Sequence, residues 1–185
     1  LSPVSWLSSI ELIDSHTGVV HKAGQLTYRM CLNVVCCGVS EGMCVLVCGA
    51  IDGSGSHYVQ VYDVLSQHVT HSVTLPYKGL SWMYGAVCTH GHLVVVSKYY
   101  TAVMRVDDLL QGRAHSVRLC NKYLSPNCYC GVSVSADDST ILLVGGVPRD
   151  NQPQHYMYQA SVSDLLGDTG PGWHKLSSPW SLGEC

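Results

Sequence analysis

The sequence has few charged residues and few residues that favour helices. Its 10 Lys and Arg and 13 Asp and Glu make up 12% of 185 residues, whereas 46% are apolar. Disordered chains have the opposite balance, so the composition excludes a disordered tail. The formal net charge of −3 argues against a nucleic-acid-binding protein, which needs a basic face. Glu occurs three times and Val 25 times, so summed propensities predict strands rather than helices. Phe is absent, and we find no physical reason for this.

Long apolar runs and the common metal-binding spacings are also missing. No apolar run approaches the ~18 residues of a membrane-spanning helix, and no basic stretch followed by an apolar run marks a signal peptide. The absence of Cys-x-x-Cys and His-x-x-x-His argues against a zinc site. The chain begins at Leu1 and stops at Cys185, so we expect a fragment of a longer protein.

Cysteine is present, but at a level below that of a small disulfide scaffold. There are ten cysteines, about 5% of the chain. Six lie in or beside Val-rich runs, where a thiol acts as a small hydrophobic group. This favours reduced, buried thiols and a cytoplasmic location. Because the count is even, a secreted chain with disulfides remains an alternative. The six are Cys36, Cys37, Cys44, Cys48, Cys88 and Cys130.

The strongest positive signal is an internal repeat of about 48 residues. Three similar apolar runs occupy residues 44–49, 92–97 and 141–146, and positions 46, 94 and 142 within them are 48 residues apart. Each run follows another apolar run and a short polar turn, which predicts a β-hairpin. An alternating run that ends near an Asp, and then a short run that ends in Leu, follow the hairpin. The Asp residues concerned are Asp63, Asp107 and Asp164, with Asp14 in a fourth, partial copy.

Units of four strands with this period predict an all-β chain, specifically a β-propeller fragment of about three and a half four-stranded blades. We place a blade remnant at 8–26 and blades at about 31–75, 85–119 and 128–176, all within a single partial propeller domain covering 1–185. This arrangement leaves sheet edges and an apolar blade face exposed. We therefore expect the remaining blades to come from a longer chain or from an oligomer.

The repeat resembles the Kelch repeat, in which an apolar strand ends in Gly-Gly, a Tyr follows, and a Trp and a Leu close the unit. The clearest copy contains Gly145 and Gly146, then Tyr158, then residues 173–176. Elsewhere Gly49 retains half of the pair, and residues 97–98 are Ser-Lys. Glycine at the end of an inner strand permits a positive φ and a close approach of neighbouring blades. A WD-type propeller, although no Trp-Asp pair occurs, and a β-sandwich are the alternative folds.

The resemblance implies a non-catalytic protein–protein interaction module, such as the substrate-recruiting part of a larger adaptor protein. Its binding loops would join the strands at the ends of the blades. Tyr, Trp and Arg are frequent in interface hot spots. The alternative is that the rings pack between blades and the polar loops are plain solvated connections. The candidate contact residues are His57, Tyr77, Trp82, Tyr84, Tyr99, Tyr100, Tyr123, Arg149 and His155.

An enzyme is the alternative function, namely a Kelch-type copper oxidase that resembles galactose oxidase, with Tyr and His ligands. The chain has 10 His and 11 Tyr, but none of them shows a convincing convergent spacing. The adjacent carboxylates Asp137 and Asp138 lie in a predicted turn, where Asp is a common turn former. We therefore expect no enzymatic activity and no cofactor or metal. We expect protein partners rather than nucleic acid or a membrane.

Overall fold

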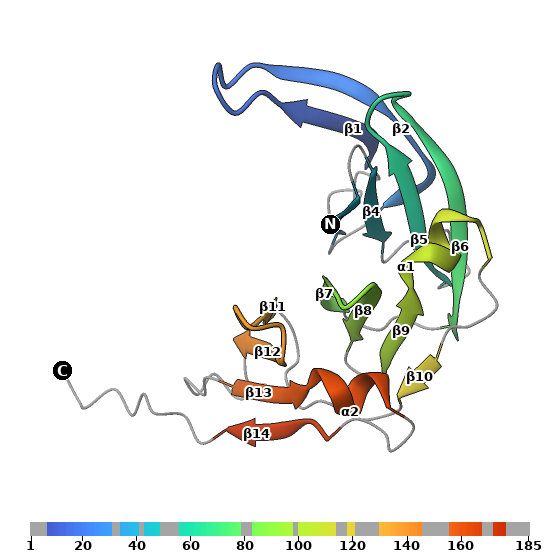
Figure 1. Cartoon of the computed structure of the whole chain (residues 1–185). Helices are drawn as coiled ribbons and strands as arrows, with labels where there is room; N and C mark the ends of the chain where they lie inside the picture. The colour runs from blue at the N-terminus through green and yellow to red at the C-terminus, as the bar shows by residue number, and fades with distance from the viewer. Residues whose placement is uncertain are drawn as a thin grey trace, which may run out of the picture. The chain divides into compact units, whose positions relative to one another are not determined.

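The computed structural model describes residues 7–30, 34–40, 43–48, 56–78, 83–97, 100–113, 118–120, 130–145, 156–167 and 172–176. Antiparallel strands dominate these residues (Figure 1). The chain divides into two compact units, which we describe separately. Unit 1 is Leu1–Leu80 with Arg105–Val117, and unit 2 is Ser81–Met104 with Arg118–Cys185.

Unit 1 contains a two-stranded sheet, a four-stranded sheet and one short helix. Strands β1 (Leu7–Ile13) and β2 (Val20–Met30) form the first sheet. The second sheet has the order β3-β4-β5-β6, so each strand pairs with its neighbour in the chain. Its strands are β3 (Val34–Ser40), β4 (Met43–Cys48), β5 (Ser56–Asp63) and β6 (His68–Lys78), and the helix is α1 (Val106–Leu110).

Unit 2 contains two four-stranded sheets of the same kind. Their orders are β10-β9-β8-β7 and β11-β12-β13-β14, so the predicted four-stranded antiparallel units are confirmed for these sheets. Helix α2 (Val162–Leu166) follows β13. The strands are β7 (Met83–Thr89), β8 (His92–Ser97), β9 (Thr101–Arg105), β10 (Arg118–Cys120), β11 (Cys130–Val134), β12 (Thr140–Gly145), β13 (Tyr156–Ser161) and β14 (His174–Leu176).

The turns follow the residues that favour them. His90 and Gly91 join β7 to β8 with φ values of 46° and 68°. Positive φ at both central residues is the signature of a two-residue hairpin turn that matches the strand twist. Gly145, at the end of β12, has a φ of 109°, so the expected positive φ is confirmed there. Gly49 and Gly146, the other two repeat glycines, lie outside the described residues.

The two helices correct the sequence prediction that the alternating runs continue as strands to Asp107 and Asp164. Strands β9 and β13 end at Arg105 and Ser161, and a five-residue helix follows each. Leu109 in α1 and Leu165 in α2 are buried, each three residues after a buried Val. The two apolar side chains of each helix therefore lie on one face, so packing fixes these short helices despite weak local propensity.

The core of unit 1 joins strand β2 to β5 and β6. The Tyr62 hydroxyl donates a hydrogen bond of 2.7 Å to the carbonyl of Ala23. Buried Gln60 accepts from the backbone N–H of Tyr28 at 3.1 Å and donates to its carbonyl at 3.3 Å. The Tyr28 ring stacks on Tyr58, with centroids 3.9 Å apart and an interplanar angle of 8°. The Gln60 amide thus pairs with β2 as a backbone peptide of a neighbouring strand would.

The core of unit 2 lies between its two sheets. Val94 and Val96 of β8 belong to the same buried cluster as Ile141 and Leu143 of β12. The sheets approach closely at Gly85, where an added Cβ would lie 3.0 Å from Val132, so this position has no room for a larger side chain without local movement. Trp173 and Thr101 add a buried hydrogen bond of 3.0 Å from the indole N–H to the Thr hydroxyl.

Candidate interaction surface

Five of the predicted contact residues, Trp82, Tyr99, Tyr123, Arg149 and His155, lie outside the described residues. The sequence predicts Tyr77 in a loop between two consecutive repeats, but Tyr77 lies within β6, which extends to Lys78. Continued pairing with β5 explains the longer strand, because Lys78 still pairs with Ser56.

His57, Tyr84 and Tyr100 were predicted as contacts, but they are only 1%, 6% and 0% exposed. Tyr84 belongs to the apolar cluster of unit 2. The backbone of Tyr100 is held by Ser97, whose N–H and hydroxyl both donate to the Tyr100 carbonyl at 2.9 Å. These side chains cannot contact a partner in this conformation, so we remove them from the candidate surface. The burial of Tyr84 in a cluster shared by the two sheets of unit 2 agrees with the alternative that these rings pack between blades.

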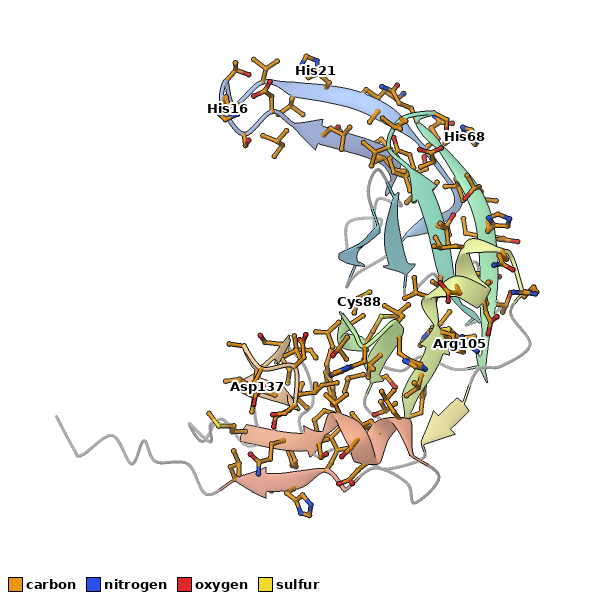
Figure 2. The ribbon with its side chains drawn as sticks, in the orientation of Figure 1. His16, His21, His68, Cys88, Arg105 and Asp137 are labelled. Carbon is orange, nitrogen blue, oxygen red and sulfur yellow. The ribbon has the colours of Figure 1, made fainter. Side chains whose placement is uncertain are left out.

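The described part of unit 2 does present an exposed polar surface at its hairpin turns. It combines the turn at His90 and Gly91 with residues 136–139 between β11 and β12, where the side chains are mostly exposed. Figure 2 shows Asp137 on this second turn. We call this set of residues, together with exposed Ser163 of α2, the turn surface.

Hydrogen bonds fix the turn surface to the sheets below it. His90 donates from Nε2 to the carbonyl of Asp138 at 3.2 Å, which links the turns of the two sheets. The N–H of Val162, the first residue of α2, donates to the carbonyl of Ser139 at 2.9 Å. The sequence reasoning missed this surface. His90 and Asp138 are 48 residues apart, so the repeat period was the signal that could have identified the link between them.

The electrostatics of the turn surface centre on Asp137. Its carboxylate accepts hydrogen bonds from the hydroxyls of Ser135 and Ser139 and from the backbone N–H of Ser139. These donors, first Ser135 and then Ser139, lower the pKa of Asp137 to about 2. Asp137 is therefore ionised at neutral pH, and its pKa is far from the range that suits a general acid or base.

The same turn chemistry recurs in unit 1. One carboxylate oxygen of Asp14 accepts from the N–H groups of His16 and Thr17 at 2.8 and 2.9 Å. Asp63 accepts in the same way from Leu65 and Ser66, at 2.9 and 3.4 Å. The Thr17 and then the His16 N–H lower the pKa of Asp14, while the Ser66 hydroxyl and then the Leu65 N–H lower that of Asp63. Asp14 and Asp63 are thus turn formers, whereas the other two repeat residues, Asp107 and Asp164, lie in the helices α1 and α2.

The described side chains and helices also provide evidence on two further roles, metal binding and membrane insertion. Within the described ranges, no group of three or more His, Cys, Asp or Glu side chains is placed to hold a metal ion. His16 and His21 lie at the exposed end of the β1–β2 hairpin in Figure 2. None of the helices in the described part of the chain is both long enough and apolar enough to cross a membrane.

Comparison with known proteins identifies the fold type. No family model matches the chain, and no curated protein sequence matches it either. Among solved structures, hydrazine synthase from Kuenenia stuttgartiensis is similar, with 14% identity and a TM-score of 0.55, over 84% of this chain and 40% of that one. The WD40 domain of Pan2 from Neurospora crassa has 7% identity and a TM-score of 0.50, over 91% and 46%. This chain therefore spans less than half of each, and it has a fold of the β-propeller type.

Proposed function

We propose that this chain is a non-catalytic protein–protein interaction module, and that it binds its partner through the turn surface. The observation that carries the proposal is the hydrogen bond from His90 to Asp138, which holds two exposed turns together above a buried core. Rigid turns lose little conformational entropy when a partner binds, so polar contacts at such a surface contribute more to affinity. Loops on a rigid scaffold commonly carry binding residues.

The finer assignment is also a proposal. We propose that the repeats are of the Kelch type, because Gly145, Tyr158 and Trp173 keep the order of that motif. Trp173 is also buried, at the end of the last repeat. On this basis the chain would act as the substrate-recruiting part of a larger adaptor protein in the cytoplasm. The cysteines in Val-rich runs support a reducing compartment.

The test uses a variant that blocks the turn surface without altering its hydrogen bonds. Ala136 is exposed in the β11–β12 turn, so Ala136→Arg adds a bulky cation there. Gln111→Arg, at an exposed position after α1, is the matched control. Tagged wild-type and variant chains would be incubated with extract from the source cells, and bound proteins would be quantified by mass spectrometry. We expect a set of partners whose recovery falls at least tenfold with Ala136→Arg alone. Equal recovery with both variants would exclude the turn surface as the binding site.

The oxidase alternative makes a different prediction. A copper oxidase would retain one tightly bound copper per chain after loading and dialysis. It would also release hydrogen peroxide when supplied with a primary alcohol and oxygen. We expect no stoichiometric copper and no peroxide, measured by metal analysis and a coupled peroxidase assay. One retained copper together with peroxide release would replace the binding-module proposal with the oxidase.

A further inference from the structure

The β11–β14 sheet has one side that faces the core of unit 2 and one side that faces away from it. We call the side that faces away from the core the outer face. The register places Val144 opposite Gly131 and Met157, and Met157 opposite Leu176. Adjacent residues point to opposite sides of a sheet, and the alternate residues Ile141 and Leu143 face the core. None of the described residues of this face is Asp, Glu, Lys or Arg. They are Gly131, Ser133, Thr140, Leu142, Val144, Met157, Gln159, Ser161, His174 and Leu176.

The outer face has the same construction as a face that is already covered. On the β7–β10 sheet Gly85 pairs with Val96. On the β11–β14 sheet Gly131 pairs in the same way with Val144, and Val144 comes 48 residues after Val96 in the sequence. Val96 is 0% exposed because the β11–β14 sheet packs over it, whereas Val144 is 46% exposed. A Cβ at Gly85 would meet Val132 of the covering sheet, but at Gly131 it would meet nothing within 4 Å. By this equivalence, the outer face is shaped to receive another sheet.

A complementary apolar face is found at the other end of the chain. Ile13 pairs with Val20 across the β1–β2 hairpin, and their side chains are 69% and 53% exposed. Ile13 precedes the turn-forming Asp14 as Tyr62 precedes Asp63, and Tyr62 packs against the sheet that comes before it in the chain. The exposed face of β1–β2 therefore corresponds to the face with which a sheet contacts its predecessor. We call it the leading face.

We propose that a second copy of this chain docks head to tail, with its leading face on the outer face of the first copy. The contact would continue the sheet-on-sheet packing found within each unit, between β2 and β5–β6 and between the two sheets of unit 2. Among the described residues, the exposed large apolar side chains are Ile13, Val19, Val20, Leu65 and Val144. All except Leu65 lie on the two faces or at their margin. This proposal is independent of the proposed function, because it concerns sheet faces rather than the turn surface.

The uncharged character of the outer face supports this occupant. Among the described residues, the charged side chains at the centre of the leading face are Glu11 and Lys22, which pair with each other across the hairpin. Their opposite charges make the pair neutral overall. Docking the two faces therefore brings no like charges together, and like charges across an interface would oppose docking. Because a two-stranded hairpin covers only part of a four-stranded sheet, the contact is at the small end of specific interfaces. We expect a dissociation constant on the order of 10–100 µM.

Sedimentation velocity and light scattering on the purified chain from 1 to about 500 µM would test the proposal over that range. We expect the mass to rise with concentration from 20.1 kDa to twice that value or more. Ile13→Lys and Val144→Lys should each weaken association at least tenfold. Leu65→Lys is the matched control, because Leu65 is 86% exposed in the turn between β5 and β6 and belongs to neither face, so the change should leave association intact. Circular dichroism melting would verify that all three variants remain folded.

A mixing experiment tests the direction of docking. The Ile13→Lys chain keeps its outer face, and the Val144→Lys chain keeps its leading face. A head-to-tail contact therefore predicts that an equimolar mixture forms a 1:1 complex that neither variant forms alone. A wild-type chain that stays monomeric at every concentration would overturn the proposal. So would a variant Ile13→Lys that associates like wild type, because the outer faces would then bind each other.

Discussion

The hydrogen bond between Trp173 and Thr101 gives the sharpest test of how unit 2 is held together. The indole N–H, on a side chain that is 2% exposed, donates to the Thr101 hydroxyl at 3.0 Å. Thr101→Val keeps the shape of the side chain but replaces this acceptor with a methyl group. The indole N–H then remains buried without the acceptor that the structure provides.

The expected cost follows from the burial of that donor. Leaving a buried donor without its acceptor costs about 1–3 kcal/mol in the free energy of unfolding. For a chain of this length each kcal/mol lowers the melting temperature by roughly 2–4 °C. Thr101→Ser is the matched control, because it keeps the hydroxyl and loses only one methyl group, at a cost of about 1 kcal/mol.

Urea unfolding followed by tryptophan fluorescence and circular dichroism would measure both variants. A double-mutant cycle with Trp173→Phe isolates the hydrogen bond, because Phe has no N–H to satisfy. In that background Thr101→Val should cost less than about 0.5 kcal/mol. The reasoning fails if Thr101→Val is as stable as wild type, or if it costs the same with Phe at position 173.

Three further predictions concern close contacts, turns and the unusual glutamine. Gly85→Ala should destabilise the chain by about 1–3 kcal/mol through overpacking, whereas Gly131→Ala should be neutral in dilute solution; chemical unfolding of both variants checks this. The pKa of Asp137 is lower when folded, so its stabilising contribution is present above about pH 4 and is lost as the pH falls toward 2. Asp137→Ala should remove this part of the pH dependence of the urea midpoint between pH 4 and 2, and an unchanged profile would contradict the assignment. Gln60→Leu leaves both Tyr28 backbone groups without this partner and should cost about 1–3 kcal/mol, measured by thermal unfolding; a loss below about 0.5 kcal/mol would contradict the pairing.

The parts of the fold that depend on local chemistry were predictable from the sequence. His90-Gly91 is a strong turn signal, and the turn formed as predicted. The four-stranded units followed from the alternation of apolar runs and turns. The short helices were missed because packing of Leu109 and Leu165, rather than local propensity, determines them.

The burial of individual residues was harder to predict, because it depends on which sheet covers which face. The period of 48 placed positions 46 and 94 in equivalent sites. In the structure position 46 pairs with Gln60, which faces the preceding sheet, while Val94 packs on the following one. A slip of one residue reverses the face of a strand, and runs that are apolar on both faces give no signal of such a slip. His57 and Tyr84 were predicted in loops for another reason, because β5 and β7 begin one or two residues earlier than the sequence pattern indicates, at Ser56 and Met83.

The candidate site could be predicted only in part for a related reason. The turn residues were recognised as turn formers, since Asp and Ser have that property locally. Their joining into one surface depends on the bond from His90 to Asp138, which connects two hairpins across neighbouring sheets. A contact of this kind arises only after the sheets have packed.

Neither compact unit is a continuous stretch of chain, and this limits how the protein can be divided. The chain leaves unit 1 after Leu80, forms strands of unit 2, and returns at Arg105 to place α1 beside β6. A truncation at residue 80 would therefore remove Leu109, which is buried, and also Gly112, which lies against His71. The segments that repeat in the sequence are thus not the segments that can be excised, so shortened versions, domain swaps and permuted chains are better opened at the turns within a sheet than between repeats.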